Sequence, residues 1–168
     1  LRMGANALAG LIYMQSKNPT DAFEGIAELV YGSDDIKSLG IAMGGPIDEE
    51  EKLKYRVALR QDEINGFRNN SWLAKDNTSG KKEFTGRIKL NWQPNSTSTI
   101  DLLLMNVNLE NGYDAWTMDN SLSTLSDKPG RDSQDTTAMG LKMKFRLHDK
   151  FELQSLTGLT HSDVLFSF

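Results

Sequence analysis

The sequence has two histidines and no cysteine, and its one cluster of catalytic residue types has a spacing that does not suit catalysis. His161, Ser162 and Asp163 are the types of a nucleophilic relay, but they are consecutive in the chain. Neighbouring side chains on a strand point to opposite faces, so these three cannot form the hydrogen bonds of a relay. The other histidine, His148, lies in a predicted turn, and there is no cysteine to supply a thiol or a disulfide. We therefore expect no catalytic residue, and the protein is predicted not to be an enzyme.

Two short motifs have the residue types of ligand binding without the context that such binding needs. Thr78–Lys81 has the end of a phosphate-binding loop, but it lacks the upstream glycine and precedes a predicted strand rather than a helix. The acidic run Asp48–Glu51 lies in a predicted turn, where carboxylates are usually solvated, and a cation site needs oxygen atoms that converge. We therefore expect neither a metal ion nor a cofactor.

Composition and charge exclude some classes of function. The 168 residues have a formal net charge of -4, whereas a general nucleic-acid binder would present a basic surface. No apolar run is long enough for a membrane-spanning helix, but a membrane-spanning β-barrel is compatible with this composition because every second residue of its strands is polar. The chain begins at Leu1 without an initiator methionine and stops at Phe168 in an apolar run. We therefore expect a fragment whose targeting segment lies upstream.

Hydrophobic residues recur at every second position in several segments, which is the pattern of strands with one apolar and one polar face. In the clearest segment, 53–60, Tyr55, Val57 and Leu59 share one parity and basic residues take the other. The pattern predicts seven strands, at 23–31, 36–44, 53–60, 84–92, 99–109, 139–147 and 151–159. Most of them are close to the roughly 9–11 residues that a tilted strand needs to cross a bilayer.

The connections between these strands alternate in length. Tight turns are predicted at 45–48, 93–96 and 148–150, and the first connection, 32–35, is also short. The connections at 62–82 and 110–135 are long and polar. Tight turns at one end and long loops at the other are typical of an up-and-down transmembrane barrel. We expect an all-β, antiparallel up-and-down meander that is a partial segment of a large transmembrane β-barrel, and an open curved sheet in the isolated chain.

Several short segments, in the same order along the chain, resemble the TonB-dependent receptors of bacterial outer membranes. Gly4–Ile12, leading into Lys17-Asn18-Pro19, is similar to the end of the plug domain in that family. The similarity continues through Phe23-Glu24-Gly25, Gly44-Gly45-Pro46, Arg56–Leu59, Gly66–Asn70 and Gly158-Leu159-Thr160, which resemble its early strands, turns and loops. The opening Leu1–Gly4 departs from the Tyr-Gly-Arg form common in that plug. The resemblance assigns residues 1–20 to the end of a plug domain and 21–168 to about the first seven strands of the barrel.

The resemblance also implies a function. Very wide barrels of about 22 strands enclose a lumen that a plug closes. A member of this family would be an active transporter of the bacterial outer membrane that takes up a scarce solute, such as a ferric siderophore or another nutrient. Its partners would be a small-molecule or metal-chelate ligand, outer-membrane lipid, and a TonB-type energy-transducing protein that acts through a region upstream of this chain. Two alternatives are a passive porin-like barrel and a soluble β-sandwich binding module, in which strands alternate for the same reason.

Two aromatic residues are candidates for ligand capture. Tyr113 and Trp116 lie in the long polar connection 110–135. Binding residues concentrate on loops carried by a rigid scaffold, so this pair is expected to contact the ligand. The alternative is that both rings pack within the loop or on neighbouring loops.

Three arginines are candidates for contacts inside the lumen. Arg56, Arg60 and Arg87 lie on the polar parity of their strands, where they would contact the plug or an anionic ligand. The favoured alternative is that basic side chains of this parity pair with carboxylates such as Glu24 and Glu28, since structural charges in a lumen are common.

The apolar parity is expected to face lipid. Aromatic residues of this parity are predicted near both ends of the strands, as in the aromatic girdles of barrels: Phe23, Tyr55, Trp92 and Phe151 at the periplasmic ends, and Tyr31 and Phe84 at the outer ends. Burial of Leu59, Leu90 and Leu141 against a second layer of the same chain would contradict this expectation.

Overall fold

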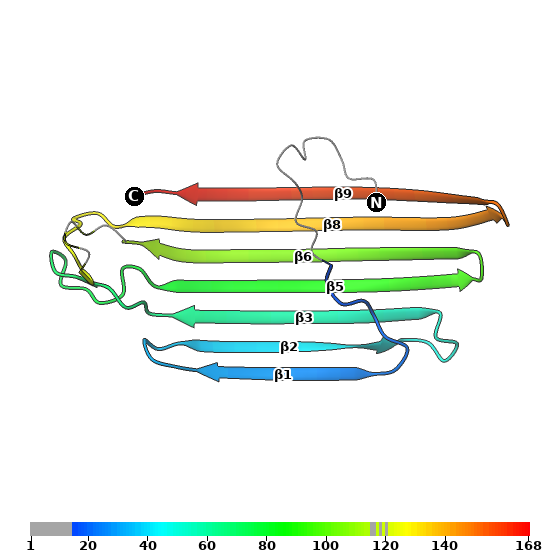
Figure 1. The fold of residues 1–168 in the computed structure, drawn as a ribbon, viewed down its shortest axis with the longest axis horizontal. Coiled ribbons are helices and arrows are strands. Elements are labelled where there is room, and N and C mark those ends of the chain that lie inside the picture. Colours follow the sequence, from blue (N-terminus) through cyan, green and yellow to red (C-terminus); the bar gives the residue numbers. More distant parts are fainter. Residues whose placement is uncertain (1–14, 115–116, 118, 120) are drawn as a thin grey trace.

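Seven long strands form one antiparallel sheet in the computed structural model, which describes residues 15–114, 117, 119 and 121–168 (Figure 1). The strands are β1 (Glu24–Tyr31), β2 (Lys37–Pro46), β3 (Leu53–Ile64), β5 (Lys81–Asn95), β6 (Ser98–Tyr113), β8 (Gly130–His148) and β9 (Phe151–Phe166). Two short strands, β4 (Asn69–Asn70) and β7 (Ser123–Thr124), form a separate parallel pair. Within the described residues the large sheet is open, with β1 and β9 as its edges.

All seven predicted strands are present, and the predicted antiparallel meander is confirmed. The predicted bounds were least accurate at the end of the sheet that carries the long loops. β8 begins at Gly130, whereas the alternation predicted a start at 139, β9 ends at Phe166 rather than at 159, and β5 begins at Lys81 rather than at 84. The predicted loops 62–82 and 110–135 were therefore too long. The added residues at the starts of β8 and β5 are mostly polar on both faces, so hydrophobic alternation does not mark them even though their backbones pair regularly.

The register separates the side chains of the sheet into two faces. Leu59 of β3 lies opposite Ile41 of β2 and Gly86 of β5, which places all three on one face. We call this the apolar face; its side chains include Leu39, Ile41, Met43, Tyr55, Val57, Leu59, Phe84, Ile88, Leu90, Trp92, Ile100, Leu102, Leu104, Met139, Leu141 and Met143. The opposite, polar face carries Glu24, Glu28, Lys54, Arg56, Arg60, Asp62, Arg87, Lys89, Asp101, Lys142 and Lys144. A slip of one residue would exchange the two faces, so the strand pairing positions the charges.

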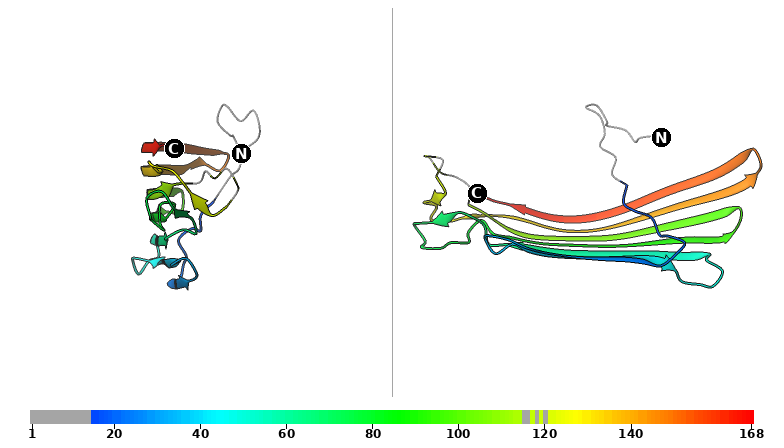
Figure 2. Two further views of the ribbon diagram at one scale, coloured as in Figure 1. Left: turned by 90° about the vertical axis from the view of Figure 1, so that its left-hand side faces the viewer. Right: turned by 60° about the horizontal axis from the view of Figure 1, so that its bottom comes forward.

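The sheet is a single bent layer (Figure 2). No hydrophobic side chain in the described part of the chain is buried; Leu59 is 44% exposed, and Leu90 and Leu141 are half-buried by their neighbours in the sheet. A soluble β-sandwich would cover such a face with a second sheet about 10 Å away. Among the described residues, no such layer lies against the apolar face. The same residues include no helix long and apolar enough to cross a membrane.

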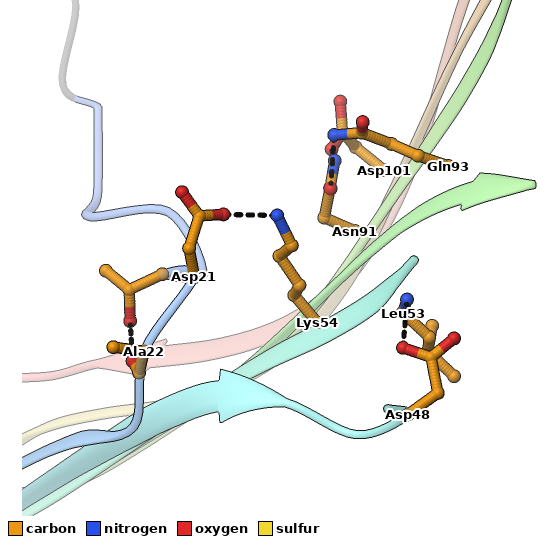
Figure 3. Close-up of polar contacts among 9 residues, drawn as sticks. Asp21, Ala22, Asp48, Leu53, Lys54, Asn91, Gln93 and Asp101 are labelled. Carbon is orange, nitrogen blue, oxygen red and sulfur yellow. Dashed lines mark hydrogen bonds and ion pairs between the residues drawn. The ribbon is translucent and has the colours of Figure 1, made fainter. Parts of the chain in front are cut away.

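Both long loops lie at one end of the sheet, as the sequence predicted (Figure 1). The turns at 47–52, 96–97 and 149–150 are on the right of the view, and the loop 65–80, the described part of the other long loop (121–129) and the short connection between β1 and β2 are on the left. Side chains stabilise two of the turns. Asp48 accepts a hydrogen bond from the Leu53 amide at 3.0 Å (Figure 3), and Asn95 accepts one from the Thr97 amide at 3.0 Å.

Candidate functional site

The segment 15–22 crosses the polar face near the tight turns before the chain enters β1 (Figures 1 and 2). Lys89 of β5 donates hydrogen bonds to the Ser16 carbonyl oxygen at 2.8 Å and to Asn18 Oδ1 at 3.0 Å. Because Lys89 belongs to the polar face, these contacts place the segment on that face. We call residues 15–22 the strap.

Two ion pairs hold the end of the strap that leads into β1. Lys54 of β3 pairs with Asp21 (Figure 3), and Lys17 Nζ lies 2.6 Å from Glu24 Oε1. The strap is therefore bound to three strands of the polar face by lysine contacts. A segment of the chain covers this face, while the apolar face has no such cover in the described structure.

A glycine in β2 allows a charge on β3 to reach a charge on β1. Gly40 lies opposite Glu28 on one side and Arg60 on the other. Arg60 Nη1 is 2.7 Å from Glu28 Oε2, although a whole strand separates their backbones. A Cβ at Gly40 would lie 3.6 Å from that nitrogen and 3.8 Å from that oxygen, so the ion pair passes directly over the absent side chain.

A second glycine of β2 has the same place between another pair of charges. Gly44 lies opposite Glu24 and Arg56, and the Arg56 guanidinium pairs with the Glu24 carboxylate. A Cβ at Gly44 would approach the Tyr55 carbonyl oxygen to 2.6 Å, closer than real contacts allow. Gly40 and Gly44 therefore leave space on the polar side of β2, which we call the glycine lane. Arginines of β3 form ion pairs with glutamates of β1 across this space.

The three arginines that the sequence singled out have different surroundings. Arg56 and Arg60 are engaged by carboxylates, which is the pairing that the sequence analysis favoured as the alternative to ligand contact. Arg60 Nε also lies 2.9 Å from Asp62 Oδ2. Arg87 pairs with both neighbouring strands through its backbone, but its side chain has no ion pair or hydrogen bond to any other described residue.

A buried cluster of polar side chains joins the two long loops. Asp114 is 3% exposed, and its Oδ2 accepts hydrogen bonds from Asn70 at 2.8 Å, Thr78 at 2.6 Å and Thr124 at 2.8 Å. Burial raises the pKa of Asp114, but these hydrogen bonds, with the positive charge of Arg68, outweigh burial and hold the pKa below its ordinary value. The carboxylate therefore stays ionised and links the loops into one unit, which we call the clasp.

The aromatic pair that was predicted for ligand capture is only partly within the described residues. Tyr113 is the last residue of β6 rather than part of a loop, and its ring is half-buried. The ring packs edge-on against Phe166 of β9, with centroids 5.0 Å apart. The Tyr113 ring therefore packs on a neighbouring strand rather than within its loop or on another loop. Trp116 lies outside the described residues.

His161, Ser162 and Asp163 alternate between the two faces of β9, as neighbouring residues of a strand do. Ser162 hydrogen bonds with Thr136 of β8 on the polar face. His161 Nε2 lies 3.4 Å from Asp163 Oδ2, and both side chains are exposed on the other face. No group of three or more His, Cys, Asp or Glu side chains in the described part of the chain could hold a metal ion.

Sequence reasoning missed the clasp and the glycine lane for different reasons. Asn70 and Asp114 are 44 positions apart, and a parallel pairing between two loops has no local signal in the sequence. The lane did have a signal, because Gly40 and Gly44 share the parity on which the flanking strands carry opposite charges. Recognising it required the register of three strands at once.

Comparisons with protein families and with curated proteins found no match. The function is therefore inferred from the two faces of the sheet and from the strap that lies on one of them.

Proposed function

We propose that this chain is part of an outer-membrane active transporter of the TonB-dependent type. Residues 1–20 would be the end of its plug domain, and 21–168 would be the first strands of its transmembrane barrel. The observation that carries the proposal is the contrast between the faces of a single-layer sheet. One face is apolar and is not covered by any described residue, and the other is charged, internally paired and crossed by the strap.

The apolar face has the properties of a surface that contacts lipid. Apolar surface left in water costs about 25 cal/mol per Å², and contiguous apolar patches above a few hundred Å² usually mark a protein or membrane contact. On β5, this face has no charged side chain from Phe84 to Trp92, close to the roughly 9–11 residues of a membrane-crossing strand. A row of charges, Lys37, Glu63 and Lys82, follows at the loop end, where a membrane surface would lie.

The open edges of the sheet support a continuation into a larger barrel. β1 and β9 expose unpaired backbone groups along their outer sides in the described structure. Open edges do not occur within the hydrocarbon region of a membrane, so further strands would have to close the wall. The strap would then lie inside the lumen, because it is bound to the polar face.

The mechanism that this arrangement suits is capture followed by passage along the lumen. The outer loops, joined by the clasp, and the plug would bind a scarce solute such as a ferric siderophore or another nutrient. A TonB-type energy-transducing protein would then rearrange the plug from the periplasmic side. Arg56 and Arg60 would stabilise the wall of the barrel, and Arg87 would be free to contact the plug or the solute.

A conductance experiment on the complete protein in planar bilayers tests this proposal. We expect a closed barrel when the plug is present and an ion-conducting pore after deletion of the plug domain together with residues 1–20. A passive porin would conduct before the deletion. A protein that is washed from membranes by urea, as a soluble β-sandwich would be, contradicts both kinds of barrel.

A further inference from the structure

Two Asn-Gly dipeptides, Asn65-Gly66 and Asn111-Gly112, have similar neighbours in the sequence and very different surroundings in the fold. An aromatic residue follows the glycine in both. In such a dipeptide the backbone nitrogen of the glycine can attack the side-chain carbonyl carbon of the asparagine, because glycine has no side chain to hinder the approach. The attack needs a glycine amide that is free of hydrogen bonds and an asparagine side chain that can turn toward it. The two dipeptides differ on both requirements.

Hydrogen bonds hold both residues of Asn111-Gly112. The Gly112 amide donates to the Gly80 carbonyl oxygen at 2.8 Å. Asn111 is 8% exposed; its Oδ1 accepts a hydrogen bond from the Lys82 amide at 3.2 Å, and its Nδ2 donates one to Glu83 Oε1 at 2.8 Å. The dipeptide also lies inside β6, where both residues pair with β8. An attack on Asn111 therefore has to wait until the strands open.

Asn65-Gly66 begins the long loop 65–80 and has fewer contacts. No described residue accepts a hydrogen bond from the Gly66 amide. Asn65 is exposed, and its Nδ2 donates a hydrogen bond at 2.7 Å to Oδ2 of Asp35, which is itself exposed. That bond leaves the carbonyl group of the Asn65 side chain free. Gly66 has a φ of 85°, which favours glycine, so the loop itself places an unhindered residue after Asn65.

We propose that Asn65 is a site of spontaneous deamidation and isomerisation. The Gly66 nitrogen loses its proton to hydroxide and forms a bond to Cγ of Asn65. The Cγ–Nδ2 bond breaks, and the side-chain nitrogen leaves as ammonia with a proton taken from water. Water then opens the succinimide ring: hydrolysis at Cγ gives aspartate, and hydrolysis at the main-chain carbonyl carbon gives isoaspartate. The chemistry needs only the fold of this loop, so it does not depend on the transport proposal.

Either product would weaken a connection between two outer segments. Asn65 joins the β1–β2 connection through its side-chain bond to Asp35 and through its backbone amide, which donates to the Asp34 carbonyl oxygen at 3.0 Å. A carboxylate in place of the amide group cannot donate to Asp35. Asp34, Asp35 and Asp76 line one cavity of about 830 Å³ together with Asn65, and no basic residue is among the described residues that line it. A further negative charge there would be repelled without a partner to offset it.

Peptide mass mapping of the complete protein, kept folded in detergent micelles at mildly alkaline pH, tests the site. We expect deamidation at Asn65 to be at least about tenfold faster than at Asn111, because Asn111 reacts only during local opening of the sheet. In urea that unfolds the protein, the two dipeptides should react at similar rates, since both glycine amides are then free. Asn65→Gln is the control and should leave position 65 unmodified, because glutamine forms the corresponding larger ring far more slowly.

Two results would overturn the site. One is equal rates at Asn65 and Asn111 in the folded protein, and the other is a faster reaction at Asn111. Both are compared with the rates in urea, so an intrinsic difference between the two sequences would not be mistaken for an effect of the fold.

Hydrogen exchange of the Asn65→Asp variant tests the consequence, because this variant imitates one of the two products. We expect faster exchange at the backbone amide of residue 65, whose partner is the Asp34 carbonyl oxygen, and no change in β5. Unchanged exchange at residue 65 would overturn the weakened connection between the two outer segments.

Discussion

The two faces of the sheet share one backbone, yet they satisfy their side chains in different ways. On the polar face, charges that belong to different strands meet across the glycine lane of β2, and the strap adds further contacts. On the apolar face, leucine, isoleucine and aromatic side chains have no second layer against them among the described residues, and none of them is buried. The difference suits a sheet whose polar face is covered by other parts of the same protein and whose apolar face contacts the surroundings of the protein. Lipid is the surrounding that we propose.

The largest expected effect comes from placing one charge on each face at the same depth. Leu90→Arg should cost about 2–4 kcal/mol of folding free energy if Leu90 lies near the middle of a bilayer. Asn91→Arg adds the same side chain at the next residue, where Asp101 can pair with it, and should leave assembly nearly unchanged. Urea titration of the protein refolded into lipid vesicles measures both. Equal losses at the two positions would contradict the assignment of the faces.

A smaller effect is expected from closing the glycine lane. Gly44→Ala should destabilise the barrel by about 1–3 kcal/mol, because its Cβ would overlap the Tyr55 carbonyl oxygen and force the backbones of β2 and β3 apart. The matched control is Gly25→Ala on β1, where the nearest atom would be 3.8 Å away. The same urea titration compares them. A Gly44→Ala variant as stable as Gly25→Ala would show that the lane is not needed.

The clasp should respond locally, without loss of the sheet. Asp114→Asn keeps the shape but turns an NH2 group toward donors that the carboxylate now accepts from, at a cost of about 1–3 kcal/mol for unsatisfied buried groups. Hydrogen exchange should become faster at Asn70 and Thr124, and exchange in β5 should not change. Unchanged protection at both loop residues would mean that the buried carboxylate does not hold the loops together.

The pH dependence of the clasp follows from the lowered pKa of Asp114. A group whose pKa is lower in the folded state stabilises that state above its unfolded pKa, which is about 3.9 for Asp. Protection of the loop amides should therefore be constant from neutral pH down to about pH 4, and it should fall as the pH drops below that value. Asp114→Asn should remove this acid-induced change. Loss of protection already near neutral pH would contradict the assigned direction.

Sequence alone predicted the strands in which hydrophobic and polar residues alternate, because the alternation shows which face each side chain lies on. The alternation in 53–60 and 84–92 located β3 and β5 and assigned their faces, because one face had to be apolar for lipid or for a core. The start of β8 at Gly130 was not predicted, since its first residues are polar on both sides. There the backbone pairing with β6 defines the strand, and side-chain type carries no signal of it.

The polar contacts were predictable to a smaller extent. The pairing of basic side chains with Glu24 and Glu28 was favoured from charge and parity, but their partners depend on glycines in the intervening strand. The clasp could not be predicted, because Asp114 draws its donors from two loops and a short parallel pairing. Tyr113 lies beside Phe166 for a similar reason, since two strand ends must first align.

Spin labelling along β5 tests the central claim most directly, because the chain has no cysteine of its own. A nitroxide is attached to single cysteines placed at each position from Arg87 to Trp92 in the complete protein in lipid vesicles. We predict that collisions with lipid-soluble oxygen are frequent at Ile88, Leu90 and Trp92, and that a water-soluble nickel complex reaches the residues between them more readily. If labels at Ile88 and Leu90 were instead shielded from both reagents, a protein layer would cover the apolar face, and the transporter proposal would be wrong.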